Sequence, residues 1–168
     1  MPSLSPVSYL VLGLIDLAGA ATPYDLKQRA AVVSGLWSLR HDQVYREPER
    51  LAAAGLLEEE REAGGRRRRL FRVTPAGRQA LKRWLQAPTA DFTELRDPGL
   101  LQLFLGAEPA ALAALQLAAH EERLRDYERL ATSLPEQTPR GPRLALQAGI
   151  GHEREWVRFW RGVQRAGR

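Results

Sequence analysis

The sequence predicts a mainly α-helical protein with one small β-hairpin, divided into an N-terminal and a C-terminal domain. Three observations support this prediction. Apolar residues recur at helical spacing over most of the 168 residues. A capping Thr or Asp directly precedes a proline, a helix-start signal, at three places. Between the helical stretches, "LLEEERE" and "RLFRV" read as two strands around a glycine-rich tip.

Composition limits the classes of protein to consider. Hydrophobic residues make up 44% of the chain, which is enough for a buried core and argues against wholesale disorder. The chain has no cysteine, so disulfides and thiolate metal sites are excluded. The N-terminal apolar run has no basic region before it, is interrupted by Asp16 and is too short to span a bilayer. We therefore expect a cytoplasmic protein without a membrane partner.

The excess positive charge of the chain is confined to its first half. Residues 1–87 hold 14 Lys and Arg against 9 Asp and Glu, whereas residues 88–168 hold 11 of each kind. The whole net charge of +5 therefore lies in the first half, which favours a polyanionic partner for that half alone. A basic face that only aids solubility is the alternative, and charge by itself does not separate the two.

Apolar spacing and caps predict the first two helices. Residues 5–18 form a helix that Gly19 ends. The next helix starts at Thr22, with Pro23 in its first position and Asp25 completing a capping box. The residues expected to face the core from these two helices are Val7, Leu10, Val11, Leu14, Leu17, Ala18, Leu26, Ala30 and Val33.

A third helix is expected to end at Gly55, and Pro48 complicates its start. Ser38 or Asp42 could cap it. An interior proline removes a backbone hydrogen bond. The helix therefore either begins near Tyr45, with Pro48 in its first turn, or bends at that proline.

The hairpin and a fourth helix complete the first domain. Phe71 and Val73 mark the inward face of the second strand. Thr74 and Pro75 then start a helix that is expected to carry apolar side chains inward, namely Leu81, Trp84 and Leu85. The order helix, helix, helix, strand, strand, helix predicts a winged helix-turn-helix domain over residues 1–87. In that fold the second helix of the pair enters the major groove, and the hairpin, called the wing, lies beside it.

The candidate DNA-binding residues come from the third helix and the wing tip. Because the chain contains no asparagine, Gln43 is left to read adenine in a bidentate manner, and Arg40 or Arg46 to read guanine. Tyr45 either contacts a phosphate or sugar, or is a core aromatic. Four arginines at the wing tip are predicted to contact phosphates, and the alternative is that they only form an exposed, solvated charge run. They are Arg66, Arg67, Arg68 and Arg69.

The order and spacing of these motifs resemble the PadR-like transcriptional regulators. "SPVSYLVLGLI" resembles their opening helix, and "HDQVY" and "RLAAAGLL" resemble the two ends of their recognition helix. "GGRRRRLFRVTPAGRQAL" resembles their wing and following helix, whereas "LRDPGLLQLF" and "GIGHEREWVRFW" resemble the C-terminal half of the subfamily with a longer, AphA-like dimerisation region. The resemblance covers nearly the whole chain. It implies a DNA-binding regulator, usually a repressor, and the family includes sensors of phenolic and other aromatic or lipophilic compounds.

Four residues depart from the family pattern. Arg46 follows Tyr45 where the family commonly has proline, and Pro48 takes the place of a leucine. Arg40 stands where a serine is usual, and Phe71 stands where tyrosine is frequent. These changes affect the shape of the recognition helix and the operator that it reads, rather than the fold.

Residues 88–168 are expected to form a helical dimerisation domain. A short helix follows Asp97 and Pro98, a longer one starts near Pro109, and the last runs from about Arg143 after the loop "SLPEQTPRGP". These helices are apolar over more than one face, so they are expected to bury the surplus against a partner chain. A homodimer whose first and last helices pack together would suit a palindromic operator.

The second domain also holds a candidate effector pocket, for which simple core packing is the alternative. Neither a cofactor nor a metal is expected, because "HEREW" lacks the second His of a zincin helix and no catalytic motif is present. We predict a sequence-specific transcriptional regulator, and not an enzyme: a repressor that a small aromatic or lipophilic effector releases. A protein-interaction adaptor without specific DNA reading is the alternative. The candidate pocket residues are Phe104, Tyr127, Trp156 and Trp160.

Overall fold

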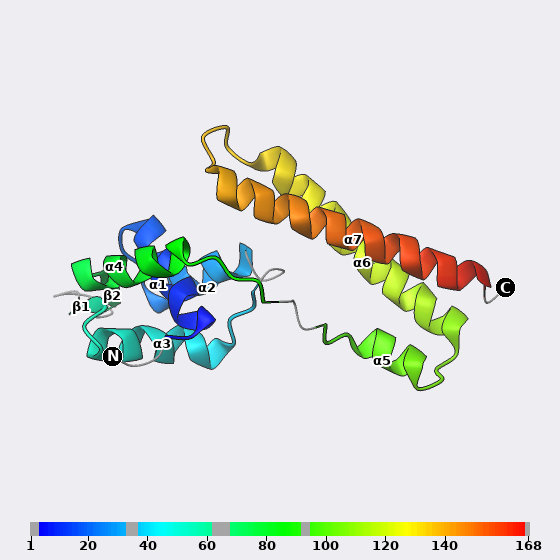
Figure 1. The fold of residues 1–168 in the computed structure, drawn as a ribbon, viewed down its shortest axis with the longest axis horizontal. Helices are drawn as coiled ribbons and strands as arrows, with labels where there is room; N and C mark the ends of the chain where they lie inside the picture. The colour runs from blue at the N-terminus through cyan, green and yellow to red at the C-terminus, as the bar shows by residue number, and fades with distance from the viewer. Residues whose placement is uncertain (1–3, 33–36, 62–67, 92–94, 167–168) are drawn as a thin grey trace. The chain divides into compact units, whose positions relative to one another are not determined.

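The fold was analysed in a computed structural model that describes residues 4–32, 37–61, 68–91 and 95–166. The chain separates into two compact units, Met1–Asp91 and Phe92–Arg168, which are described one by one (Figure 1). Helices dominate both units, and the one sheet among the described residues is a two-stranded antiparallel hairpin. The sequence prediction of a mainly α fold with a small wing is thereby confirmed.

The first unit contains four helices and the hairpin. Their order is helix, helix, helix, strand, strand, helix, as in a winged helix-turn-helix. The elements are α1 (Pro6–Ala18), α2 (Pro23–Val32), α3 (His41–Ala53), β1 (Leu57–Arg61), β2 (Arg69–Val73) and α4 (Pro75–Gln86).

Short-range caps start the first two helices. The Ser5 side chain caps α1, and Gly19 ends that helix with a φ of 74°. At α2 the backbone N–H of Asp25 donates to Thr22 Oγ1 (3.2 Å), and the N–H of Thr22 donates to Asp25 Oδ2 (3.0 Å). These hydrogen bonds form the predicted capping box. The hydrogen bond from the backbone of Thr22 is the main reason why the pKa of Asp25 is lowered.

The core of the first unit lies between α1, α2, α3 and β2. One expected core residue of α1 is wrong: Leu17 is exposed, whereas Leu12 and Ile15 are buried. Because α1 is apolar on more than one side, spacing alone did not decide which stripe faces inward. Val33, another expected core residue, lies outside the described residues. The large buried side chains of this core are Val11, Leu12, Ile15, Leu26, Val44, Leu51 and Phe71.

Helix α3 runs through Pro48 instead of starting near Tyr45. Its first residue is His41, and the flanking residue at its N-terminus is Arg40, so neither Ser38 nor Asp42 caps it. The lost hydrogen bond of Pro48 is offset by burial of its ring in the core. At the other end, Gly55 has a φ of 72° and closes the helix as predicted.

The hairpin is tied to the helical body by backbone hydrogen bonds. Leu57 pairs with Val73 and Arg61 with Arg69 in the antiparallel register. Phe71 also exchanges two backbone hydrogen bonds with Ala21, which lies between α1 and α2 (2.9 and 3.0 Å). Strand β2 is therefore held on both of its edges.

Helix α4 packs closely against the end of α3. Thr74 Oγ1 accepts from the N–H of Gly77 (3.0 Å) and donates to the carbonyl of Gly55 (2.8 Å). A Cβ atom on Gly77 would lie 2.1 Å from the carbonyl oxygen of Leu56, so only glycine fits there. Leu81 is buried as predicted.

The other two predicted core residues of α4 do not enter the core. Leu85 is exposed, and Trp84 stacks on Tyr9 of α1 with ring centroids 4.6 Å apart and planes 8° from parallel. The indole ring therefore covers the side of α1 rather than filling the interior.

The second unit contains the helices α5 (Pro98–Phe104), α6 (Pro109–Ser133) and α7 (Arg140–Ala166). Asp97 caps α5 as predicted, by accepting from the N–H of Leu100 (3.0 Å). Helices α6 and α7 lie side by side along most of their length, with α5 beside α6 (Figure 1). Helix α7 begins at Arg140 and not near Arg143, because Pro142 is tolerated in a first turn. No helix among the described residues is long and apolar enough to cross a membrane.

Candidate nucleic-acid interface

Helix α3 presents one buried face and one exposed polar face. Val44, Pro48 and Leu51 are buried in the core of the first unit. Tyr45 and Arg46 lie on the opposite side and are exposed. An amphipathic helix that is held by its apolar face leaves its polar side chains free for another molecule.

The N-terminus of α3 organises two of the predicted base readers. The backbone N–H of Arg40 donates to Gln43 Oε1 (3.0 Å), so the Gln43 side chain reaches back and satisfies a free donor at the helix start. The Arg40 guanidinium is exposed and pairs with Asp42 (3.3 Å). Within the described residues Gln43 therefore keeps its amide N–H groups free, whereas its oxygen already accepts one hydrogen bond.

Tyr45 is not a core aromatic. Its ring is 44% exposed and tilts against His41, with ring centroids 5.2 Å apart. This contact holds the phenol on the exposed side of α3, close to Arg46. The interpretation of Tyr45 as a surface residue is the one that agrees with its position.

A hydrogen-bond network anchors α3 to α1. The Arg50 guanidinium donates to both carboxylate oxygens of Glu47 (3.1 and 2.6 Å) and to Oγ of the buried Ser8 (2.7 Å). The hydrogen bond from Arg50 holds the pKa of Glu47 below its usual range. The sequence analysis missed this network because Ser8 and Arg50 lie 42 residues apart. Its effect is to fix the orientation of α3 on the domain.

Arg69, at the start of β2, forms a second anchor. Its guanidinium donates to both carboxylate oxygens of Glu59 on β1 (2.7 Å each) and also binds the carboxylate of Glu49 on α3. The Arg69 guanidinium lies 5.4 Å from the centre of the Phe71 ring. We call Arg69, Glu59 and Glu49 the wing clamp, because they join both strands of the wing to α3.

The electrostatics of the wing clamp are those of a persistent ion pair. The hydrogen bonds from Arg69, and secondarily from Arg61, lower the pKa of Glu59 to about 2. The two carboxylates raise the pKa of Arg69. Glu59 and Arg69 therefore stay charged throughout the neutral range, and Arg69 is committed to its partners within the domain.

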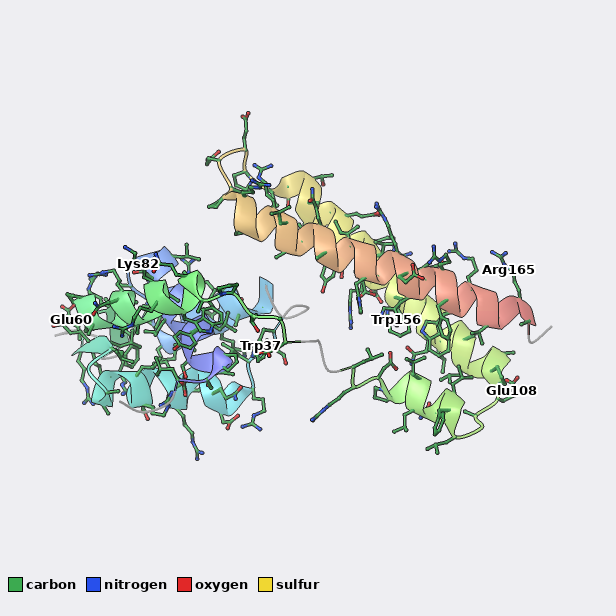
Figure 2. All side chains as sticks on the ribbon, in the orientation of Figure 1. Trp37, Glu60, Lys82, Glu108, Trp156 and Arg165 are labelled. Atoms are coloured by element: carbon green, nitrogen blue, oxygen red, sulfur yellow. The ribbon has the colours of Figure 1, made fainter. Side chains whose placement is uncertain are left out.

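Arg68 differs from Arg69 in its surroundings. Arg68 is exposed and makes no hydrogen bond or ion pair within the described part of the chain; its charge contributes weakly to the lowered pKa of Asp25. Arg66 and Arg67 lie outside the described residues. Glu60, on the outward side of β1, marks the wing in Figure 2.

The four predicted effector-pocket residues occupy different environments in the second unit. Phe104, on α5, is 86% exposed, whereas Trp160, on α7, is completely buried. Tyr127 and Trp156 are half-buried. The Tyr127 ring packs over Gly149, and burial raises the pKa of its hydroxyl. None of the four lines the concave basic surface between α6 and α7.

A buried carboxylate beside these aromatics was not predicted. Glu153, only 4% exposed, lies 2.6 Å from Nδ1 of His120 and 3.8 Å from the guanidinium of Arg123. His120 also stacks on Trp156, whose indole N–H donates to Nε2 of His152 (2.7 Å). His120 on α6 thus contacts α7, and His152 contacts a residue of its own helix, α7. Within the described residues, no three potential ligands gather as a metal site.

Two family matches divide the chain in the same way as its fold. Residues 11–83 match the transcriptional regulator PadR-like family, and residues 95–166 match the C-terminal domain of virulence activator alpha. The chain belongs to the PadR-like family. It carries the AphA-like type of C-terminal region, as the sequence motifs implied. This is a family of transcriptional regulators, in agreement with the prediction that the chain is not an enzyme.

Solved structures of the PadR-like family share the whole fold. The structure of Bacillus subtilis PadR in complex with operator DNA matches with a TM-score of 0.82 and 22% identity, over 99% of both chains. A PadR-like regulator from Bacillus cereus matches with a TM-score of 0.81 and 16% identity, over 96% of this chain and 97% of that one. The Vibrio cholerae virulence activator AphA matches with a TM-score of 0.71 and 24% identity, over 95% of this chain and 96% of that one. A search of curated protein sequences gave no match.

Proposed function

We propose that this PadR-like regulator is a sequence-specific DNA-binding repressor. The observation that carries the proposal is the exposed polar face of α3, which two side-chain networks hold rigidly on the domain beside the wing. In this proposal α3 enters the major groove, and Gln43, Arg40 and Arg46 contact base edges. Tyr45 and Arg68 contact the sugar-phosphate backbone, as do Arg66 and Arg67. The bound operator in the Bacillus subtilis PadR structure supports this use of the fold.

The wing clamp changes the proposed role of Arg69. A guanidinium that already binds two carboxylates has to give up those partners to reach a phosphate. We therefore assign Arg69 to positioning the wing, and assign the phosphate contacts to the arginines that precede it.

We further propose that the protein acts as a homodimer on a palindromic operator. Large apolar side chains are exposed on α1 and on the helices of the second unit, where they would be costly to leave in water. The best examples are Leu17, Phe104, Leu105 and Leu115. Light scattering should show a dimer at micromolar concentration, and a stable monomer would contradict the proposal.

Release by a small aromatic or lipophilic effector completes the proposal. The half-buried rings of Tyr127 and Trp156, with Phe104 and Trp160, are the candidate binding residues. A thermal-shift screen of aromatic compounds should find one that stabilises the protein and weakens its DNA complex. If every stabilising compound leaves DNA binding unchanged, effector release is refuted.

The test of DNA reading begins with selection of bound fragments from genomic DNA. Electrophoretic shift assays on a selected fragment and on a scrambled duplex then measure the specificity ratio. Gln43→Ala should relax the preference at one base pair by about 1–3 kcal/mol, whereas wild-type protein should prefer the selected fragment by at least about a thousandfold. Equal, weak binding to both duplexes would favour a protein-interaction adaptor instead.

A further inference from the structure

A concave basic surface lies between α6 and α7, away from the aromatic residues described above. It encloses about 650 Å³, a volume in the range of small-ligand sites. Trp156 and Arg165 project to opposite sides of α7, because residues nine apart are separated by about two and a half turns (Figure 2). The concave surface lies on the Arg165 side. We call it the arginine groove, and its arginines are Arg125, Arg154, Arg158, Arg161 and Arg165.

Two ion pairs between the helices define the register of the arginine groove. Arg161 donates to Glu121 (2.6 Å), and Arg154 donates to Glu128 (2.8 Å). Because α6 and α7 run antiparallel, residues 124–125 of α6 lie opposite residues 157–158 of α7 between these two pairs. The two acidic groups that line the groove are therefore already matched to two of its five arginines.

The groove carries more positive than negative charge, since five arginines and two glutamates line it. Arg125 makes no ion pair with the described residues, and Arg158 binds only Glu155 on its own helix. Neither faces an acid across the groove. Two guanidinium groups that share one concave surface repel each other unless an anion lies between them.

The same position has an apolar floor. The buried Val157 and the half-buried Leu124 line the groove beside these two arginines. Guanidinium groups bind phosphate and carboxylate oxygens in a bidentate manner, and apolar side chains bind hydrocarbon. A purely inorganic ion would use the charge and leave the floor exposed.

We propose that the arginine groove binds a small organic dianion, a phosphate monoester or a dicarboxylate with an apolar body. Arg125 and Arg158 bind the anionic end, and Leu124 and Val157 contact the apolar part. The proposal goes beyond DNA binding and does not depend on it, since the groove shares no residue with α3 or the wing.

Isothermal titration of the full-length protein with hexyl phosphate at pH about 7.5, where the monoester is a dianion, tests the proposal. Butylmalonate replaces the phosphate by a dicarboxylate and distinguishes the two sources of charge. Inorganic phosphate supplies charge without the apolar body, and hexanol supplies the body without charge. At least one of the two amphipathic dianions should saturate the protein more tightly than either of these controls.

Variants locate the site. The double variant R125A/R158A should lower the affinity for the bound dianion by at least about tenfold. The matched variant R129A/R140A removes the same charge from the same two helices outside the groove, and should stay within about twofold of wild type. Equal losses in both double variants would indicate non-specific attraction and overturn the proposal. So would the absence of saturable binding of either dianion by wild type up to about 5 mM. Circular dichroism verifies that both variants are folded.

Discussion

Replacing Arg69 by methionine tests the wing clamp directly. The substitution keeps an unbranched side chain but removes three charge-assisted hydrogen bonds, two to Glu59 and one to Glu49. It also leaves these two carboxylates near each other without their shared cation. Both effects destabilise the folded first unit relative to the unfolded chain.

The pKa of Glu59 sets the size of the effect. Arg69 is the main reason why this pKa lies at about 2 instead of near its usual value, and each unit corresponds to about 1.4 kcal/mol. The full shift would amount to about 3 kcal/mol. The side chains of Arg69 and Glu59 remain 33% and 23% exposed, so solvent screening reduces the expected loss to about 1–2 kcal/mol.

The pH dependence follows from the direction of the shift. A carboxyl whose pKa is lowered by folding contributes stability above its unfolded pKa, near 4.3, and loses that contribution as the pH falls towards about 2. Wild type should therefore exceed Arg69→Met in stability by about 1–2 kcal/mol at pH 7. The difference should shrink as the pH is lowered through 4 towards 2, because Glu59 becomes protonated.

Urea unfolding of wild type, Arg69→Met, Glu59→Gln and the double variant measures the coupling between the two groups. A coupling energy of about 1–2 kcal/mol is expected at pH 7. Arg68→Met is the matched control, because the neighbouring exposed arginine makes no ion pair with the described residues. Additive effects of the two substitutions, or an equal loss in the Arg68 variant, would refute the wing clamp as a stabilising contact.

Three further predictions concern the close packing around Gly77, the wing, and the buried carboxylate of Glu153. Gly77→Ala should destabilise the first unit by more than about 2 kcal/mol in urea unfolding, since its Cβ meets a backbone oxygen at 2.1 Å; Gly13→Ala, with open space around it, should be neutral or stabilising by up to about 1 kcal/mol. Arg68→Ala should weaken binding to all duplexes alike and flatten the slope of log affinity against log salt by about one unit, whereas an unchanged slope would remove Arg68 from the backbone contacts. Glu153→Ala should cost about 1–3 kcal/mol of stability because it removes the hydrogen-bond partner of Nδ1 of the part-buried His120; wild-type stability in this variant, or in His120→Ala, would show that the pair contributes little.

Local signals predicted the start and end of most elements. The caps at Thr22, Thr74 and Asp97 depend on groups about three residues apart, so their residue types are sufficient to locate them. The left-handed conformation of Gly55 was predictable for the same reason. These contacts form within a few residues and do not depend on how the rest of the chain packs.

Packing between elements was less predictable. Trp84 was expected in the core, but it stacks on Tyr9, which lies 75 positions earlier in the sequence. Leu17 was expected inside, but α1 turns its Leu12 and Ile15 stripe inward. In both helices more than one face is apolar, and the choice between faces depends on which elements pack against them. Periodicity within one helix does not contain that information.

The roles of the four consecutive arginines at the wing depend on packing between elements in the same way. The four are the same residue type, and their charge alone led to the prediction that all four contact phosphates. The hairpin register places Arg69 opposite Arg61 and diagonal to Glu59, and the fold brings Glu49 of α3 to the same point. Arg69 thereby neutralises carboxylates that would otherwise repel a phosphate backbone. In the proposed DNA complex, Arg69 therefore contributes by cancelling negative charge beside α3, and the arginines nearer the tip supply the direct attraction.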